Sequence, residues 1–279
     1  MSRLTAVLLA ALLGAMAPAA MAGQSCEQRP VTAAQLSHAL SLAERVHARL
    51  AAHDTDIAIL ARVGSDVSAY GLRWTHAGLV YRVDGAQGWR VLHKLNYCGR
   101  DSADLYRQGL ANFFLDDPEE WRAWLLIPGA DLQRQIAAAL RTGAAQALNE
   151  PRYSMIAYPF ALRFQNSNQW LLELLAVAAD PSQAADRSSA QRWLRRTGYE
   201  PGSVAITPFK RFGASVARPN ISFNDHPLAD RLQGSYKLVT VESLEQYLRG
   251  QGALAASEEI RLPGPAPHAH SAAGGFRQR

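Results

Sequence analysis

Residues 72–97 read LRWTHAGLVYRVDGAQGWRVLHKLNY. Two arms rich in aromatic and branched residues flank the turn-forming sequence DGAQG at residues 84–88, and this pattern predicts a β-hairpin. Each arm carries one histidine, His76 in the first and His93 in the second. Because neighbouring strands hold their side chains close together, the two imidazoles predict a catalytic or ligand-binding site on this hairpin.

The segments around the hairpin mix helical and extended patterns without regular alternation. Apolar residues at helical spacing predict helices at residues 32–52, 101–112, 131–148, 189–196 and 241–249, and a further helix that starts near Ser167 or Asn168. Short apolar runs predict strands at residues 56–63, 121–127, 203–206, 215–223 and 236–241. This mixture favours an α+β fold with a mixed, largely antiparallel sheet packed with helices.

The first 22 residues have the features of a secretory signal peptide. Arg3 supplies positive charge, residues 4–13 are apolar, and small residues at Ala20 and Ala22 precede a cleavage site near Ala22. We therefore expect a periplasmic or secreted protein.

After the signal, residues 23–262 are long enough for a single globular domain with a substantial core. Residues 263–279 are rich in Pro, Gly, Ala and His, which is typical of a disordered tail.

The composition argues against several classes of binding partner. The net charge is only +5, and the basic residues are scattered rather than grouped, which argues against nucleic-acid binding. No stretch after the signal approaches the ~20 apolar residues that a membrane-spanning helix needs. No spacing typical of metal ligands and no cofactor motif is present, so we expect neither. The partner is expected to be an envelope substrate or protein, whose identity the sequence leaves open.

The chain has two cysteines, Cys26 and Cys98. In an oxidising compartment a single pair predicts one disulfide, which would join the N-terminal segment to the end of the hairpin. The alternative is that Cys98 is a free nucleophile. That alternative is disfavoured because no helix start follows Cys98 to lower the pKa of its thiol.

Two short motifs and a histidine between them follow one another along the chain. They are THAG at residues 75–78, His93, and NSNQWL at residues 166–171. In this respect the chain resembles circularly permuted papain-like hydrolases, which include NlpC-type cell-wall peptidases and lecithin:retinol acyltransferases. The resemblance implies a papain-like core in which His76 is the general base. The position that holds the nucleophilic cysteine in these hydrolases is occupied by Ser167 in this chain. A serine hydroxyl is a weaker nucleophile than a thiolate until a base removes its proton.

The residue that orients His76 depends on the register of the hairpin. If the turn is centred on Ala86, His76 lies opposite Asn96, whereas a shift of one residue or a bulge brings His93 to the face of His76. Both therefore stay candidates for the orienting role. The resemblance also suggests side chains that bind substrate or an oxyanion: Asn166, Asn168, Gln169, Trp74, Trp170 and Tyr158.

Four separated motifs also resemble a family of exported bacterial proteins catalogued only as a domain of unknown function, DUF2145. They are WTHAG at 74–78, LNYCG at 95–99, QNSNQW at 165–170 and NDHP at 224–227. This second resemblance implies no activity.

The last motif adds Asp225 and His226 to the candidates. They could bind a metal or complete a site, but we favour the alternative that Asp225 caps a helix that has Pro227 at its first position.

Two hypotheses follow. In the first, the protein is an exported hydrolase or acyltransferase that acts on amide or ester bonds of the cell envelope, with His76, Ser167 and His93 or Asn96 as its catalytic residues. In the second, it is a catalytically inactive binding or envelope-assembly protein on the same scaffold, and Ser167 merely caps its helix. The position of the Ser167 hydroxyl relative to His76 distinguishes the two.

Overall fold

The structure, a computed structural model, describes residues 30–83, 88–116 and 118–262. The predicted signal peptide at 1–22, Cys26 and the predicted tail at 263–279 lie outside these residues. The centre of the fold is a six-stranded sheet in the order β4-β3-β2-β1-β5-β8, in which every neighbouring pair is antiparallel. Its strands are β1 (Ile57–Val63), β2 (His76–Arg82), β3 (Trp89–Asn96), β4 (Ala103–Gln108), β5 (Glu120–Pro128) and β8 (Leu254–Arg261).

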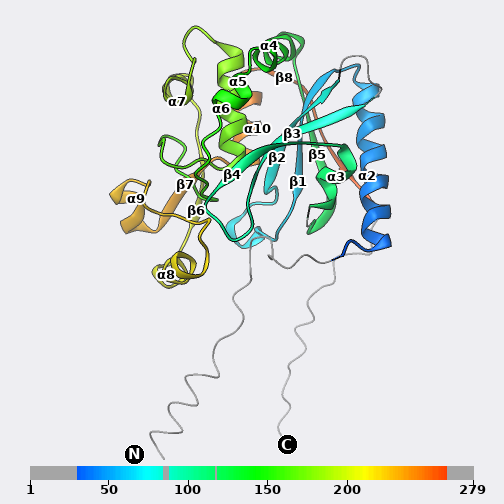
Figure 1. The fold of residues 1–279 in the computed structure, drawn as a ribbon. Coiled ribbons are helices and arrows are strands. Elements are labelled where there is room, and N and C mark those ends of the chain that lie inside the picture. Colours follow the sequence, from blue (N-terminus) through cyan, green and yellow to red (C-terminus); the bar gives the residue numbers. More distant parts are fainter. Residues whose placement is uncertain (1–29, 84–87, 117, 263–279) are drawn as a thin grey trace, which may run out of the picture.

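Helices cover both faces of the sheet, so the molecule has three layers (Figure 1). One face carries α2 (Ala33–Ala52) and α3 (Leu110–Leu115). The other carries α4 (Ala130–Arg141), α5 (Ala144–Ala147), α6 (Ser167–Ala179), α7 (Arg187–Arg196) and α10 (Val241–Gly250). A 3-10 turn, η1 (Ser68–Tyr70), precedes β2. The predicted α+β class with an antiparallel sheet is confirmed.

A small two-stranded sheet stands beside the main one (Figure 1). It pairs β6 (Gly202–Ala205) with β7 (Ser235–Leu238), and α8 (Pro208–Ala217) and α9 (Leu228–Gln233) lie between these strands in the sequence. Its own apolar cluster joins Val204, Phe223 and Tyr236 to Ile156 of the main body.

The helix α6 begins at Ser167, as predicted, and it is buried from Ser167 to Ala178. The side chain of Asn166 caps it by accepting a hydrogen bond from the Gln169 amide at 2.7 Å. A helix that is apolar on all sides belongs in the interior, and α6 accordingly packs against β2 on one side and α4 on the other.

The hairpin register places His93, not Asn96, on the face of His76. Pairs run from Arg82↔Trp89 to Leu79↔Leu92, which is one residue away from the register that would set His76 opposite Asn96. The β2–β3 ladder ends at that last pair, so both histidines lie just beyond it.

Several predicted elements were wrong. Residues 101–112, predicted as one helix, form the strand β4 and then the start of α3, because residues 103–108 pair with residues 91–96 of β3. Residues 215–223, predicted as extended, begin inside α8, which starts with a Thr207 cap and a proline at its first turn. The predicted helix at 131–148 is broken at Gly143, which has a φ of +78°. The strand β8 was not predicted.

The helix α2 matches its predicted range, and a capping box between Thr32 and Gln35 begins it. Ala43, Val46 and Leu50 lie on its buried face. The structure buries Ala39 and Leu42, whereas Leu36 and Leu40 are 45% and 53% exposed.

Candidate active site

Polar side chains from β2, β3, β4 and the start of α6 form one continuous hydrogen-bonded chain. The Ser167 Oγ lies 3.0 Å from Nδ1 of His76, and Nε2 of His76 lies 2.8 Å from Nδ1 of His93. On the far side, Nε2 of His93 lies 3.1 Å from the side-chain oxygen of Gln108. We call this set of Ser167, His76, His93 and Gln108 the serine–histidine relay.

The order of donors and acceptors in the relay follows from Gln108, the residue at its far end. The Oε1 atom of Gln108 only accepts, so His93 donates through Nε2 and its Nδ1 is the acceptor. His76 must then donate through Nε2, which leaves its Nδ1 lone pair facing the hydroxyl of Ser167. The neutral relay therefore places a proton acceptor against the serine, which is the arrangement that a general base requires.

Both imidazoles are held in the neutral form. Burial is the main cause that lowers the pKa of His76 well below its ordinary value, followed by the charge of Arg62 and then by His93. Burial and Arg62 lower the pKa of His93 to about 4, although Asp116 and the hydrogen bond that His93 donates to Gln108 oppose the shift. Arg62 is paired with Asp116, and its guanidinium lies over the Phe113 ring at 5.2 Å.

An aromatic ring from α3 closes the relay on one side. The Phe113 centroid lies 5.8 Å from that of His76 and 5.2 Å from that of His93. Ser167 is only 5% exposed and His76 8% exposed, so the reactive atoms are recessed from the surface.

Ser167 is the first residue of α6, where backbone N–H groups have no acceptor within the helix and the helix dipole favours negative charge. The N–H groups of Ser167 and Asn168 therefore lie where an anion formed near the Ser167 hydroxyl would be stabilised. Tyr153 also contacts this hydroxyl. Burial raises the pKa of Tyr153 to about 12, and its hydrogen bond with the Ser167 side chain opposes that rise.

Asn168 ties the start of α6 to the strand that carries His76. Its side-chain oxygen accepts from the Ala77 amide at 3.0 Å, and its Nδ2 donates to the carbonyl of Thr75 at 3.4 Å. These bonds flank His76 in the sequence, so they fix the strand backbone relative to Ser167.

The other proposed binding residues do not meet at the relay. Trp170 is fully buried and donates to the carbonyl of Ala145, and Trp74 packs against Trp124. Gln169 donates to Glu173 inside α6 and to the carbonyl of Pro159.

Two further candidates from the hairpin and the 152–164 segment also lie apart from the relay. Asn96 pairs with Ala103 and donates to the carbonyl of Tyr97, on the strand face opposite His93. Tyr158 contacts the ring of His226.

The pair Asp225 and His226 forms a separate buried cluster that clamps the 152–164 segment. Asp225 accepts from the Tyr158 amide at 2.9 Å, and His226 donates through Nε2 to the carbonyl of Ile156 at 2.7 Å. Burial raises the pKa of Asp225. The alternative that Asp225 caps a helix was wrong, because the N-cap of α9 is Pro227.

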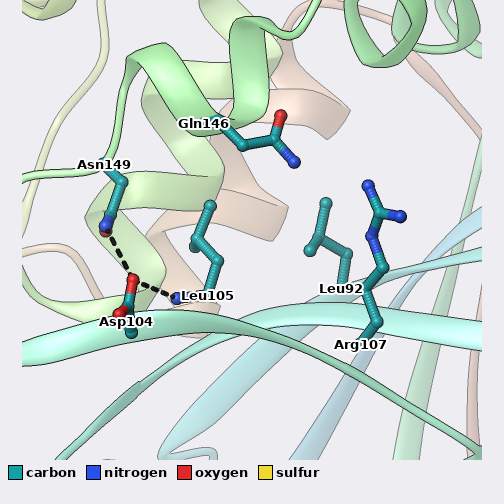
Figure 2. A pocket seen from close by; sticks show the side chains of 6 residues that line it. All are labelled: Leu92, Asp104, Leu105, Arg107, Gln146 and Asn149. Atoms are coloured by element: carbon teal, nitrogen blue, oxygen red, sulfur yellow. Dashed lines mark hydrogen bonds between the residues drawn. The ribbon is translucent and has the colours of Figure 1, made fainter.

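A cavity of about 410 Å³ lies between the β3–β4 edge and α5 (Figure 2). In Figure 2, Asn149 and Asp104 are hydrogen-bonded on one side, and Arg107 and Gln146 lie on the other. Leu92 contributes to the core on the α6 side, so this cavity opens on the face of β3 opposite His93. None of the described residues that line it belongs to the relay.

Sequence reasoning missed Gln108, Arg62 and Tyr153. Gln108 was hidden because its segment, residues 101–112, was assigned to a helix. The alternation ADL at 103–105 was the signal that could have placed this segment on a strand. Arg62 pairs with His76 in the ladder between β1 and β2, whereas Tyr153 reaches the site through tertiary packing.

The sequence also led to expectations about metal ions, membrane-spanning helices and a disulfide. Within the described parts of the chain, no group of three or more His, Cys, Asp or Glu side chains is arranged to hold a metal ion, and no helix is long and apolar enough to cross a bilayer. Because Cys26 lies outside the described residues, its disulfide with Cys98 stays a prediction.

A bacterial protein family described as "Uncharacterized protein conserved in bacteria (DUF2145)" matches residues 49–248. The matched region contains the entire serine–histidine relay. Neither the curated proteins nor the solved structures include a match to the chain.

Proposed function

Because the chain belongs to this bacterial family, DUF2145, whose description gives no activity, we propose its function from the geometry of the relay. The protein is a serine hydrolase or acyltransferase that cleaves amide or ester bonds. This proposal rests on the 3.0 Å distance between the Ser167 Oγ and the unprotonated Nδ1 of His76.

In the first half of the reaction, the Ser167 Oγ attacks the carbonyl carbon of the substrate while its proton passes to Nδ1 of His76. The resulting imidazolium donates through Nε2 to His93, which Gln108 holds in the accepting tautomer. The carbonyl oxygen, now negative, lies near the first turn of α6, where the N–H groups of Ser167 and Asn168 can donate to it.

Collapse of this intermediate breaks the bond to the leaving group, which takes the proton from His76. In the second half, His76 removes a proton from water or from an acceptor hydroxyl or amine, which attacks the acyl carbon. His76 then returns this proton to the Ser167 Oγ as its bond to the acyl carbon breaks. Water gives hydrolysis, and another nucleophile gives acyl transfer.

The expected location sets the substrate class. The signal-like residues 1–22 support export, and the resemblance to NlpC-type enzymes points to amide or ester bonds of the cell envelope. A Cys26–Cys98 disulfide would fit the same oxidising compartment.

A second candidate function, a non-catalytic binding or assembly protein, is favoured by a different observation. The orienting residue His93 is neutral, and the charge of Arg62 opposes protonation of His76. Both features weaken the base, and a serine needs a stronger base than a cysteine does.

A fluorophosphonate probe separates the two functions. Its phosphorus is attacked by an activated serine with loss of fluoride, so labelling requires the proton transfer described above. We expect the probe, mapped by peptide mass spectrometry, on Ser167, with labelling lost in Ser167→Ala and His76→Ala but kept in the surface control Ser182→Ala. Folded wild-type protein that takes up no label, or a Ser167→Ala variant that still does, would contradict the hydrolase.

A further inference from the structure

The helices α8 and α9, which lie between β6 and β7 in the sequence, carry the most exposed large apolar side chains of the described chain. Phe209 is 87% exposed, Leu232 79% and Leu228 62%, whereas no other large apolar side chain among the described residues exceeds 56%. Soluble proteins expose single apolar side chains often, but three such residues on adjoining elements indicate a contact surface.

These residues belong to two neighbouring helices. Arg211 of α8 donates to the carbonyl of Arg231 in α9 at 3.1 Å, which joins the helices. Leu228 and Leu232 are four residues apart and therefore share one face of α9. Figure 1 shows both helices at the periphery of the molecule, on the side away from α2. We call Phe209, Leu228 and Leu232 the α8–α9 patch.

The segment that bears the patch is basic. Residues 207–238 contain five Lys and Arg against two Asp, a net charge of +3 out of the chain's +5. One of the two acids, Asp225, is buried and bonded to the Tyr158 amide. Lys210, which follows Phe209, and Lys237 are exposed, so this segment presents positive charge to the solvent.

We propose that the α8–α9 patch docks the protein on an anionic lipid bilayer. Protruding Phe and Leu side chains with flanking Lys and Arg are the composition of helices that lie in the membrane interface. The charge of the segment complements anionic headgroups. The three apolar side chains are largely exposed, which suits insertion between headgroups better than capture of a peptide.

This docking is independent of the proposed hydrolase, because it involves none of the relay residues. It would place the small sheet against the membrane and leave the six-stranded sheet, with the relay, in the aqueous phase.

Co-sedimentation of the full chain with vesicles tests the proposal. Phosphatidylglycerol vesicles supply an anionic surface, and phosphatidylcholine vesicles supply a neutral one. We expect binding to the first that weakens with added salt, and much weaker binding to the second. Replacing Lys210 and Lys237 by Glu should lower the binding constant by roughly fivefold or more for each cation removed.

The decisive comparison uses two variants with altered exposed apolar residues. Phe209→Ser/Leu228→Ser/Leu232→Ser should lower binding by roughly tenfold for each side chain that inserts. The matched control, Leu36→Ser/Leu40→Ser on α2, should bind as wild type does, which also accounts for any binding by the apolar N-terminal residues.

Far-UV circular dichroism and the thermal midpoint check that both variants fold. Equal vesicle binding by the triple variant and the α2 control would overturn the proposal. So would a patch-dependent self-association, or binding to an acidic protein, in the absence of any vesicle binding.

Discussion

The Nε2 atom of His76 and the Nδ1 atom of His93 are 2.8 Å apart, although the ladder between their strands ends at Leu79 and Leu92. The two histidines are therefore diagonal neighbours just beyond the last paired residues, and their imidazoles meet across the opening between β2 and β3. This relationship makes His93 the residue in contact with His76, while Asn96 points to the opposite face of β3. It also leaves Nδ1 of His76 free for Ser167.

The first prediction concerns the orienting residue. His93→Ala removes the acceptor that fixes the His76 tautomer, so we expect fluorophosphonate labelling of Ser167 to slow by roughly 100-fold, at the low end of general-base contributions. Asn96→Ala should label at the wild-type rate, because Asn96 does not contact His76. Time courses of labelling on folded proteins measure both rates. Equal slowing in the two variants would mean that hairpin stability, and not orientation, controls the reaction.

A second prediction follows from the lowered pKa of His76. The base works only when neutral, and burial and Arg62 keep it neutral at a pH below the ordinary histidine pKa of about 6.5. Labelling of Ser167 should therefore stay constant as the pH falls through about 6.5 and decline only at a lower pH. Arg62→Gln removes a positive charge and should move that decline upward. A wild-type decline centred on 6.5 would show that His76 is solvated.

Stability should depend on pH through His93. Its pKa is about 4 in the folded protein and about 6.5 in an unfolded chain, so between these values only the unfolded state takes up the proton. The free energy of unfolding is therefore complete above about pH 6.5 and falls as the pH decreases toward 4. The full loss from His93 amounts to about 3 kcal/mol.

Urea unfolding at about pH 7 and about pH 5 measures this loss. In His93→Gln the decrease between the two pH values should be smaller than in the wild type, since the variant has no imidazole to protonate at this position. An identical decrease would assign the effect to other histidines.

The sequence predicted the parts of the site that depend on local signals. Capping residues and apolar periodicity indicate the helices that begin after Thr32 and Asn166. The turn-forming residues indicate the hairpin. The choice between His93 and Asn96 stayed open because a register shift of one residue exchanges the two faces of a strand.

What sequence reasoning missed depends on contacts between distant segments. Residues 103–108 contain spacings that suit a helix, yet pairing with β3 makes them a strand and brings Gln108 to His93. β8 was missed because its alternation is weak; it is an edge strand with only one neighbour, β5. Propensity is a weak prior wherever strand pairing determines the outcome.

A disulfide between Cys26 and Cys98 is the fourth prediction. It should stabilise the protein by ~4 kcal/mol on the chain-entropy model, because it closes a long loop. Non-reducing peptide mapping should find the two cysteines in one cross-linked peptide, and Cys26→Ser and Cys98→Ser should lower the urea midpoint equally. A free thiol on Cys98 in protein purified from an oxidising compartment would refute the bond.

The last prediction concerns Gly78, the residue that lets β2 approach β3 beside the two histidines. A Cβ atom at this position would lie 2.7 Å from Cγ1 of Val91 and 2.9 Å from Cβ of His93. Real contacts of this kind do not occur, so β3 must shift. Gly78→Ala should therefore destabilise the protein by about 1–3 kcal/mol, as other overpacked sites do. It should also slow the labelling of Ser167, because the shift moves His93 away from His76.

Two further variants separate crowding from a general effect of replacing glycine. At Gly109 a Cβ meets nothing within 4 Å and φ is −72°, so Gly109→Ala should leave both stability and labelling near wild type. Adding Val91→Ala to Gly78→Ala removes one of the two clashes but keeps the one with His93. The double variant should therefore still label slowly. Wild-type labelling in Gly78→Ala itself would mean that the contact between the two imidazoles is not needed to activate the serine.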